Sequence, residues 1–462
     1  MRVRVEPGGR LAGEVRVPGD KSVAHRWLLL AATASGRSTL LEVPSSLDVR
    51  STAACLAALA PHARRALQAW ARNGTGHREG HRSTWNVRVE SEVPGGATKA
   101  VEVEGEGRRA LSEAAGPLRC GNSGTSMRLL MGLLATTGFR TVLTGDPSLS
   151  SRPMERVAEP LRALGARIAT IDGHAPITID GGPLRGTVVA PSVPSAQIKS
   201  AVLLAGLDAD GTTTVRESVP TRDHTERALQ ALGAPIERID GSIAVRRFQH
   251  EGFSARVPGD PSSAAFLVAA AALTGSVLEI VEVGLNPTRT HFLEVMARMG
   301  VETEVEVRHE EMGEPVGDIL VRPTSSVHAV QVEPGELPLV IDEVPVLAGL
   351  AAHAPAASRF LGAGELRVKE SDRLRGLAEG IRAMGGEAAV EGEDLVVAGG
   401  GLAGGVAEAR GDHRMAMAFA VSGLAARAPV DVEGMETADV SFPGFIQTLD
   451  ALGASIQVVG AR

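Results

Sequence analysis

The chain has 462 residues, of which 44% are hydrophobic and 22% are charged, and its formal net charge is −8. This length divides most naturally into two domains of about 200 residues each, and the composition is typical of a folded globular protein. The acidic balance and the lack of a basic run argue against a nucleic-acid partner. Cations gathered at one place in such a protein would instead indicate a small anionic ligand.

The sequence also lacks the signals of a membrane or secreted protein. No apolar run has the length of a membrane helix, and the first residues lack the apolar core of a signal peptide. Because the only cysteines are Cys55 and Cys120, we expect no disulfide framework and a reducing, cytoplasmic location.

The first motif is the stretch 17–26, Val-Pro-Gly-Asp-Lys-Ser-Val-Ala-His-Arg. Its Pro-Gly pair ends the preceding strand, and either Asp20 or Ser22 can cap a helix that carries Lys21 and, one turn later, Arg26. Backbone N–H groups, the positive end of the helix and two cations then meet at one point, which favours a phosphate or carboxylate ligand. A single motif of this kind is more often an ordinary capped surface helix, so its recurrence decides the interpretation.

A phrase close to Leu-x-Ala-Leu-Gly-Ala recurs along the chain, and each copy predicts a helix that ends at a glycine and is followed by a strand. The copies are spaced 68, 67, 85 and 68 residues apart and are marked by Gly165, Gly233, Gly300, Gly385 and Gly453. A degenerate sixth copy begins at Leu56. Such a period predicts repeated supersecondary units around a core.

A second repeated motif is Val-Pro-Gly-Asp, which occurs at Val17 and again at Val257. It predicts two points at which the chain passes from one domain to the other. We expect residues 20–256 to form one domain of three repeats, and residues 1–19 with 257–462 to form the other.

Residues 61–117 are expected to contain a solvated insertion, with 87–90 and 101–104 as two strands that have polar faces. His77 and His81 have the spacing of metal ligands, but the flanking glycines and the lack of a third ligand argue against a metal site.

Further helix starts in the first half carry polar or charged groups. Cys120-Gly-Asn-Ser-Gly-Thr precedes a helix whose buried face is marked by Met127, Leu130, Met131 and Leu134. The others are Arg152 before Pro153, Ser195-Ala-Gln, and the loop that contains Arg222.

The second half has the densest set of such starts. Lys369, Glu370 and Arg373 surround one helix start, and Leu374, Leu377, Ile381 and Met384 mark its buried face. Asp342 and Glu343 precede an apolar run, and Arg414 stands at another helix start. Each group taken singly is a cap or a surface charge. Together they predict a cationic site in an interdomain cleft, with a few acids for proton transfer.

The motifs occur in the order found in the 3-phosphoshikimate 1-carboxyvinyltransferase (EPSP synthase) family, which the chain resembles over nearly its whole length. They are Pro-Gly-Asp-Lys-Ser, Gly-Asn-Ser-Gly-Thr, Arg-Pro-Met, Ser-Ala-Gln, Asp-Glu-Val-Pro, Lys-Glu-Ser-Asp-Arg and Asp-His-Arg-Met-Ala. The resemblance implies an α/β fold of two domains, each built of three βαβαββ repeats as an inverse α/β barrel, with the active site between them.

The resemblance also implies a shikimate-pathway transferase that leads to chorismate and the aromatic amino acids. Such an enzyme transfers the enolpyruvyl group of phosphoenolpyruvate to the 5-hydroxyl of shikimate 3-phosphate by addition and elimination, and releases phosphate. It would act as a monomer without a metal or organic cofactor.

The matched motif positions assign roles to individual residues. Glu370 is the expected acid and base at carbon, Asp342 the base on the 5-hydroxyl, and Lys21 a participant in proton transfer. The residues expected to bind phosphoenolpyruvate are Lys21, Asn122, Gly124, Arg152, Gln197, Arg373 and Arg414. Those expected to bind shikimate 3-phosphate are Lys21, Ser22, Arg26, Ser195, Ala196, Gln197, Arg222, Asp342 and Lys369.

The sequence departs from the family pattern in three places. Val440 stands where some members have a lysine, no tyrosine is available near Arg222, and the stretch 61–117 is unusual. An alanine at the position of Gly124 is associated in this family with tolerance of glyphosate, so the glycine predicts sensitivity.

Two other functions were weighed. The sister family of UDP-N-acetylglucosamine enolpyruvyl transferases usually has a Lys-Asn pair and a reactive cysteine before Arg-Pro, whereas here Ser22 follows Lys21 and Ser151 precedes Arg152. Cys120 lies in a different loop and is interpreted as a small packing residue. A non-catalytic anion-binding repeat protein would be expected to have lost Lys21 or the acids Asp342 and Glu370, and all three are present.

Overall fold

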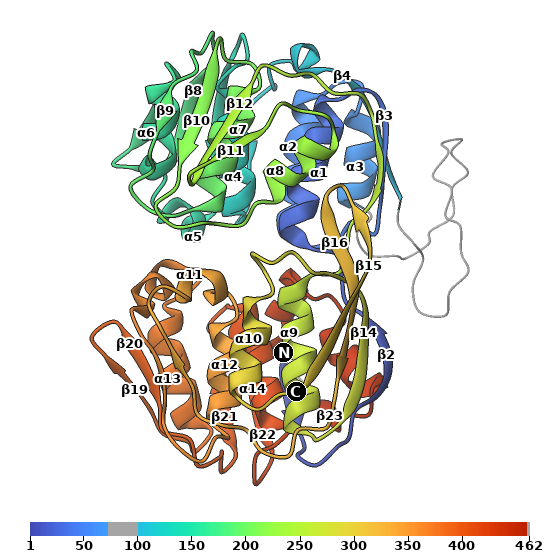
Figure 1. Ribbon diagram of the computed structural model, residues 1–462, viewed down its shortest axis with the longest axis vertical. Helices are drawn as coiled ribbons and strands as arrows, with labels where there is room; N and C mark the ends of the chain where they lie inside the picture. The colour runs from blue at the N-terminus through green and yellow to red at the C-terminus, as the bar shows by residue number, and fades with distance from the viewer. Residues whose placement is uncertain (73–99, 460–462) are drawn as a thin grey trace. The chain divides into compact units, whose positions relative to one another are not determined.

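The computed structural model describes residues 1–72 and 100–459, and the chain forms two compact units (Figure 1). Unit 1 comprises Met1–Pro18, Gly259–His309 and Pro315–Arg462, and unit 2 comprises Gly19–Pro258 and Glu310–Glu314. The tip of one hairpin from the second half of the chain therefore belongs to unit 2, which the sequence did not indicate. Each unit has its own apolar core.

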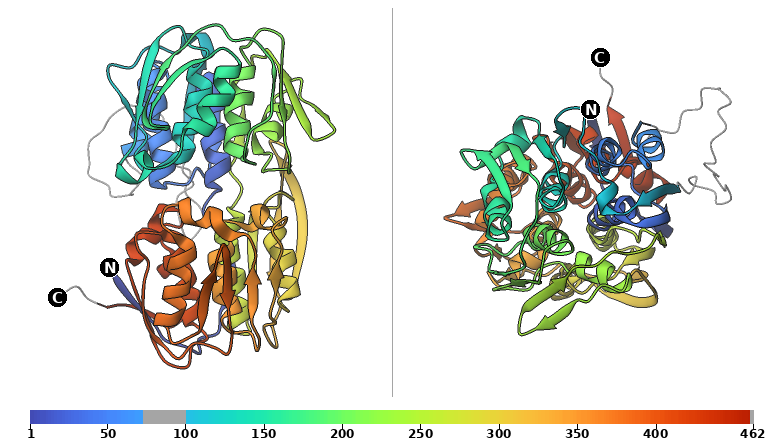
Figure 2. Two further views of the ribbon diagram at one scale, coloured as in Figure 1. Left: turned by 90° about the vertical axis from the view of Figure 1, so that its left-hand side faces the viewer. Right: turned by 90° about the horizontal axis from the view of Figure 1, so that it is seen from above.

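Six copies of one helix pair build the units, three copies in each. The first helix of each copy is buried on nearly all sides, which is where a helix that is apolar all round is stable. These inner helices are α1 (Lys21–Thr33), α4 (Gly124–Leu134) and α7 (Ala196–Gly206) in unit 2, and α9 (Pro261–Leu273), α12 (Val344–Ala351) and α14 (His413–Gly423) in unit 1. Within unit 2, α4 packs against α1 and α7, and within unit 1, α14 packs against α9 and α12. Figure 2 shows the helices of each unit side by side.

The second helix of each copy buries only one face. These outer helices are α2 (Leu47–Leu59), α6 (Glu155–Ala163), α8 (His224–Ala231), α10 (His291–Arg298), α13 (Arg373–Ala383) and α15 (Phe445–Ala451). The remaining short helices are α3 (Arg64–Arg72), α5 (Pro147–Ser150) and α11 (Leu337–Val340), with 3-10 turns at Arg108–Ala110, Ala363–Val368 and Met435–Val440.

The five repeat glycines end five of the outer helices, as the sequence predicted. All five have positive φ, between 76° and 110°. The residue after each glycine donates its N–H to a carbonyl five residues earlier, as in Ala166 to Leu161 at 3.1 Å, which is the Schellman arrangement. A strand follows each glycine, so the repeat is confirmed at these positions.

The strands of the described residues, 1–72 and 100–459, form six small sheets. In each sheet the first strand given below runs parallel to the second, and the second pairs antiparallel with the third. The sheets of unit 2 are β13 (Ser254–Arg256), β3 (Ser35–Leu41), β4 (Val101–Glu106); β5 (Leu118–Arg119), β6 (Arg140–Thr144), β8 (His174–Asp180), β7 (Arg167–Ile171); and β9 (Val188–Val189), β10 (Thr212–Arg216), β12 (Ser242–Arg246), β11 (Glu237–Ile239). The sheets of unit 1 are β2 (Ala12–Arg16), β14 (Val277–Gly284), β16 (Glu314–Val321), β15 (Thr303–Glu311); β17 (Gln331–Val332), β18 (Ser358–Phe360), β20 (Asp394–Val397), β19 (Ala388–Glu391); and β21 (Gly405–Glu408), β22 (Val430–Glu433), β1 (Arg2–Val5), β23 (Ile456–Val459).

Part of the stretch 61–117 is integral to unit 2. The predicted strand at 101–104 is β4, in which Val101 and Val103 point into the core, and α3 buries Leu67. The predicted strand at 87–90 and the pair His77 and His81 lie outside the described residues.

Candidate active site

In unit 2, the N-terminus of α1 is capped by Asp20, which decides between the two caps that the sequence allowed. Its carboxylate accepts hydrogen bonds from the backbone N–H groups of Ser22 and Val23 at 2.6 and 3.0 Å. Lys21 follows at once, and its Nζ lies 2.9 Å from a carboxylate oxygen of Asp48 on α2. This ion pair holds the ammonium group of Lys21 at the positive end of the helix.

Arg26, one turn further along α1, is almost completely buried. Its guanidinium donates to the hydroxyls of Thr225 and Ser200 at 2.8 and 3.0 Å, and to the Ser22 carbonyl at 2.8 Å. Burial lowers the pKa of Arg26 to about 10, with Arg222 acting in the same direction and Glu226 opposing it. The group remains cationic at neutral pH, so it offers positive charge to an anion.

A second set of polar groups gathers at the N-terminus of α4, which Ser123 caps. Arg152 donates to the side-chain oxygen of Asn122 at 2.6 Å, and Asn122 donates to Asp146 at 2.8 Å. A Cβ added to Gly124 would lie 3.4 Å from a terminal nitrogen of Arg152. Because Gly124 has no side chain, the guanidinium of Arg152 can lie close to the start of α4.

Gln197, in the first turn of α7, joins the same set. It donates to the Thr125 hydroxyl at 2.9 Å and accepts a hydrogen bond from Arg128 on α4. Sequence reasoning missed Arg128, although its position one turn after Gly124 was an available signal.

Lys199 is a second group that sequence reasoning missed. Its side chain is 2% exposed and forms ion pairs with Glu217 at 2.9 Å and Glu226 at 2.8 Å. Its Nζ also donates to the Thr221 carbonyl at 3.1 Å, which fixes the loop that carries Arg222 to α7. Burial raises the pKa of Glu226, and the charge of Lys199 opposes that shift. A lysine inside an apolar helix, four residues after Ser195, was the available signal.

In unit 1, Arg373 is the centre of the predicted cluster. Its Nε donates to Asp412 at 2.7 Å, one terminal nitrogen donates to Glu370 at 2.6 Å, and the other lies 3.6 Å from Asp342. Burial acts to lower the pKa of Arg373, but the surrounding carboxylates, Asp412 first, raise it above its ordinary value. Burial likewise acts against the charge of Asp412, yet Arg373 holds the pKa of that carboxyl below its usual range.

Arg414 and Lys369 complete this cluster. Asp412 caps α14 and accepts from the Arg414 N–H at 3.0 Å, while the Arg414 guanidinium donates to the Asp342 carbonyl at 2.8 Å and lies 3.7 Å from Glu343. Lys369 is half-buried, and burial lowers its pKa although Asp342 opposes the shift. Four acids, two arginines and a lysine thus meet where α12, α13 and α14 begin.

The predicted residues divide into two sets, one in each unit, which we call the unit 2 cluster and the unit 1 cluster. The unit 2 cluster contains Lys21, Ser22, Arg26, Asn122, Gly124, Arg152, Ser195, Ala196, Gln197 and Arg222. The unit 1 cluster contains Asp342, Lys369, Glu370, Arg373 and Arg414. Val440 ends the 3-10 turn Met435–Val440.

No three His, Cys, Asp or Glu side chains among residues 1–72 and 100–459 are grouped as metal ligands. No helix in the described part of the chain has the length and apolarity needed to cross a membrane.

Six copies of one α/β unit, with cations and carboxylates at the starts of both inner and outer helices, define a two-domain protein of the enolpyruvyl transferase class. The sequence model of the family described as EPSP synthase (3-phosphoshikimate 1-carboxyvinyltransferase) matches residues 5–82 and 87–449. The chain belongs to the EPSP synthase family. The match passes through most of the stretch 61–117 and omits only residues 83–86.

Individual relatives agree with this assignment. A 3-phosphoshikimate 1-carboxyvinyltransferase of Thermus thermophilus is 46% identical over 463 residues, which cover 98% of this chain and 99% of that protein. The one from Halorhodospira halophila is 44% identical over 464 residues, covering 99% and 97%.

Solved structures confirm the predicted fold. The EPSP synthase of Acinetobacter baumannii matches with a TM-score of 0.82 and 37% identity, covering 99% of this chain and all of that one. The enolpyruvyl transferase NikO from Streptomyces tendae shares the fold, with a TM-score of 0.72 at 19% identity.

Proposed function

We propose that this protein transfers the enolpyruvyl group of phosphoenolpyruvate to the 5-hydroxyl of shikimate 3-phosphate, giving 5-enolpyruvylshikimate 3-phosphate and phosphate. The observation that carries the proposal is the pair of carboxylates, Asp342 and Glu370, on one buried guanidinium in a chain of this family. An addition–elimination needs two such groups, since one proton moves at carbon and another at oxygen.

The reaction proceeds in two steps. In the first, Glu370 gives a proton to C3 of phosphoenolpyruvate, the 5-hydroxyl oxygen forms a bond to C2, and Asp342 takes the hydroxyl proton. In the second, Glu370 takes a proton back from C3, the double bond between C2 and C3 forms again, and the C2–O bond to phosphate breaks. Lys21 contacts both substrates and takes part in these proton transfers.

The cationic residues bind the two substrates, together with several polar groups. Arg152, Arg373 and Arg414, with Asn122, Gly124 and Gln197, bind phosphoenolpyruvate. Shikimate 3-phosphate is bound by the cationic groups Arg26, Arg222 and Lys369 together with Ser22, Ser195 and Ala196. Arginine forks suit this role because they pair with carboxylate and phosphate groups in a bidentate manner. In the proposed reaction, these residues replace a metal or an organic cofactor as the source of positive charge.

The proposal extends to the state of the protein, a monomer in the cytoplasm. Support for the location comes from Cys55 and Cys120, which are both buried and not linked to each other.

The reaction in D2O tests the proposed chemistry directly. Phosphoenolpyruvate and shikimate 3-phosphate are incubated with the protein, and the products are followed by mass spectrometry. The expected result is 5-enolpyruvylshikimate 3-phosphate with deuterium in its C3 methylene, because C3 is protonated from exchangeable groups during the addition step. Formation of the product without deuterium at C3 would contradict the mechanism, and no product from folded protein would contradict the function.

A further inference from the structure

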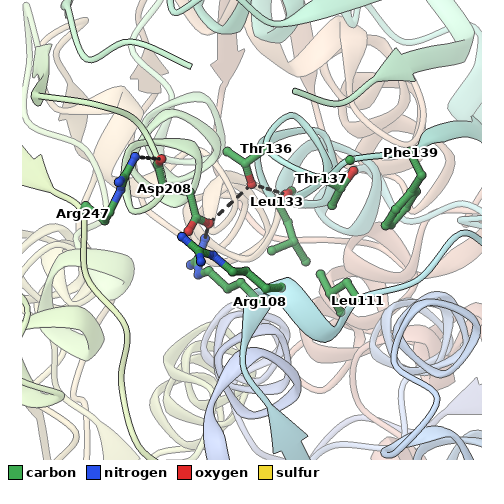
Figure 3. A pocket seen from close by; sticks show the side chains of 10 residues that line it. Arg108, Leu111, Leu133, Thr136, Thr137, Phe139, Asp208 and Arg247 are labelled. Carbon is green, nitrogen blue, oxygen red and sulfur yellow. Dashed lines mark hydrogen bonds and ion pairs between the residues drawn. The ribbon is translucent and has the colours of Figure 1, made fainter. Parts of the chain in front are cut away.

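Unit 2 contains a cavity of about 250 Å³ that the proposed reaction does not use (Figure 3). It is lined by residues at and just after the C-terminal ends of two inner helices, Leu133 and Thr136 for α4 and Asp208 for α7. The proposed active-site groups stand at the other ends of these helices. Along α4 the separation is roughly 16 Å, given about 1.5 Å per residue.

The charged residues that line this cavity are mostly cationic. Arg108, Arg109 and Arg247 line it, against the single carboxylate of Asp208. Two of the guanidinium groups reach the same residue, since Arg108 donates to the Asp208 carboxylate at 3.1 Å and Arg247 donates to its backbone carbonyl at 3.1 Å. Figure 3 shows both side chains directed toward Asp208. Both cations therefore contact Asp208, Arg108 through its carboxylate and Arg247 through its backbone carbonyl.

Two of the three guanidinium nitrogens of Arg108 make no hydrogen bond to the described residues. Its side chain is 3% exposed, and one terminal nitrogen donates to the Leu204 carbonyl at 2.8 Å. Within residues 1–72 and 100–459, its Nε and its second terminal nitrogen are buried and have no hydrogen-bond partner. A buried donor without a partner is costly, so an acceptor that reached these nitrogens after a shift of the Arg108 side chain would be bound favourably.

The other wall of the cavity is apolar. Leu111, Leu133 and Phe139 line it, and Phe139 is the only aromatic residue among the lining side chains. A cavity of this size admits only a small molecule. Its ligand must therefore combine an acceptor of negative charge with a compact apolar body.

We propose that this cavity binds a small aromatic carboxylate, with its carboxylate on Arg108 and Arg247 and its ring against Phe139. The guanidinium fork matches a carboxylate in geometry and charge, and the ring of Phe139 offers an aromatic ligand an offset or edge contact. The site is separate from the proposed active site and does not depend on the function proposed above.

The test uses 4-fluorobenzoate as the probe and follows its binding to the full chain by fluorine NMR. The neutral 4-fluorobenzamide has nearly the same shape and is the ligand control. The variant Arg247→Gln removes an exposed cation of the cavity, and Arg246→Gln is its matched control, because Arg246 pairs with Glu237 and does not line the cavity. A third variant, Arg108→Lys, keeps the buried charge and one donor but removes the two unpartnered nitrogens.

The proposal predicts that 4-fluorobenzoate binds and that 4-fluorobenzamide binds at least tenfold more weakly, about the effect of one charge-assisted pair. Arg247→Gln and Arg108→Lys should each weaken 4-fluorobenzoate binding by about tenfold, and Arg246→Gln should leave it unchanged. Equal binding of the two probes, or equal affinity of the wild type and Arg247→Gln, would overturn the proposal. So would the absence of 4-fluorobenzoate binding to folded wild-type protein.

Discussion

Asp342 and Glu370 lie on the two terminal nitrogens of a single guanidinium, that of Arg373, at 3.6 and 2.6 Å. The third side of the guanidinium is held by Asp412 at 2.7 Å. This buried arginine therefore holds Glu370 by a hydrogen bond and lies near Asp342, and Asp412 holds the arginine. In the proposed reaction, the two acids act on neighbouring atoms of one substrate pair.

The variant Glu370→Gln should lower kcat by at least about 100-fold, because it removes the proposed acid and base at C3 while keeping the shape of the side chain. The matched control is Glu379→Gln on α13, where Glu379 is a surface partner of Arg375. Steady-state turnover together with circular dichroism of both variants checks this. A near-normal rate for Glu370→Gln would remove the residue from proton transfer.

The variant Arg152→Ala should raise the KM for phosphoenolpyruvate by about 10- to 100-fold, because it removes a proposed charged partner of that substrate. Arg140→Ala is the control, since Arg140 is exposed and lies 3.7 Å from Asp180. Initial rates with each substrate varied in turn provide the measurement. An effect confined to shikimate 3-phosphate would show that the assignment of Arg152 is wrong.

We expect the wild type to be sensitive to glyphosate, and the variant Gly124→Ala should weaken this inhibition by about tenfold or more. The added Cβ would lie 3.1 and 3.4 Å from terminal nitrogens of Arg128 and Arg152, so one of these flexible ends must shift. Gly116→Ala is the control, because nothing lies within 4 Å of a Cβ at that position. Inhibition constants measured against phosphoenolpyruvate test this, and a wild type inhibited only at millimolar glyphosate would contradict it.

Acid should destabilise unit 2 through His25, which is completely buried on α1. Burial lowers the pKa of His25 to about 3, with Asp48 opposing the shift. The unfolded chain takes up this proton near pH 6.5 and the folded chain does not, so the stabilisation is complete above pH 6.5 and is lost as the pH falls toward 3. The contribution lost by pH 5 is about 2 kcal/mol.

Urea unfolding at pH 7 and pH 5 measures this loss. The free energy of unfolding of the wild type should fall by about 2 kcal/mol more than that of His25→Gln over this interval. His309→Gln changes an exposed histidine and should behave as the wild type does. Equal losses in the wild type and His25→Gln would show that His25 does not govern the acid sensitivity.

Local signals were sufficient to predict the repeat and the helix starts. Five glycines with positive φ follow outer helices, and the buried face predicted from Leu374 to Met384 is buried in the structure. The N-terminus of α4 and that of α7 also lie where Ser123 and Ser195 allow a cap. These features depend on residues within one or two turns of each other, which a sequence displays directly.

Pairings between distant segments could not be predicted in this way. One such pairing joins Lys21 to Asp48. Another places the tip of the β15–β16 hairpin in unit 2. There, Glu314 contacts His224 at 2.8 Å, and the Gly313 carbonyl accepts a hydrogen bond from Arg227 at 2.9 Å. The partners of the hairpin tip are about 90 residues apart in sequence, so no local pattern relates them. The ion pairs of Lys199 could not be predicted either. A buried ammonium group requires charged partners, and the burial of Lys199 is known only from the structure.

The central claim is the transfer of an enolpyruvyl group to shikimate 3-phosphate, and phosphate release with two alternative acceptors tests it most directly. The protein is supplied with phosphoenolpyruvate and either shikimate 3-phosphate or UDP-N-acetylglucosamine, and phosphate is measured over time. We expect release with shikimate 3-phosphate alone. Release with UDP-N-acetylglucosamine alone, or with neither acceptor in folded protein, would contradict it.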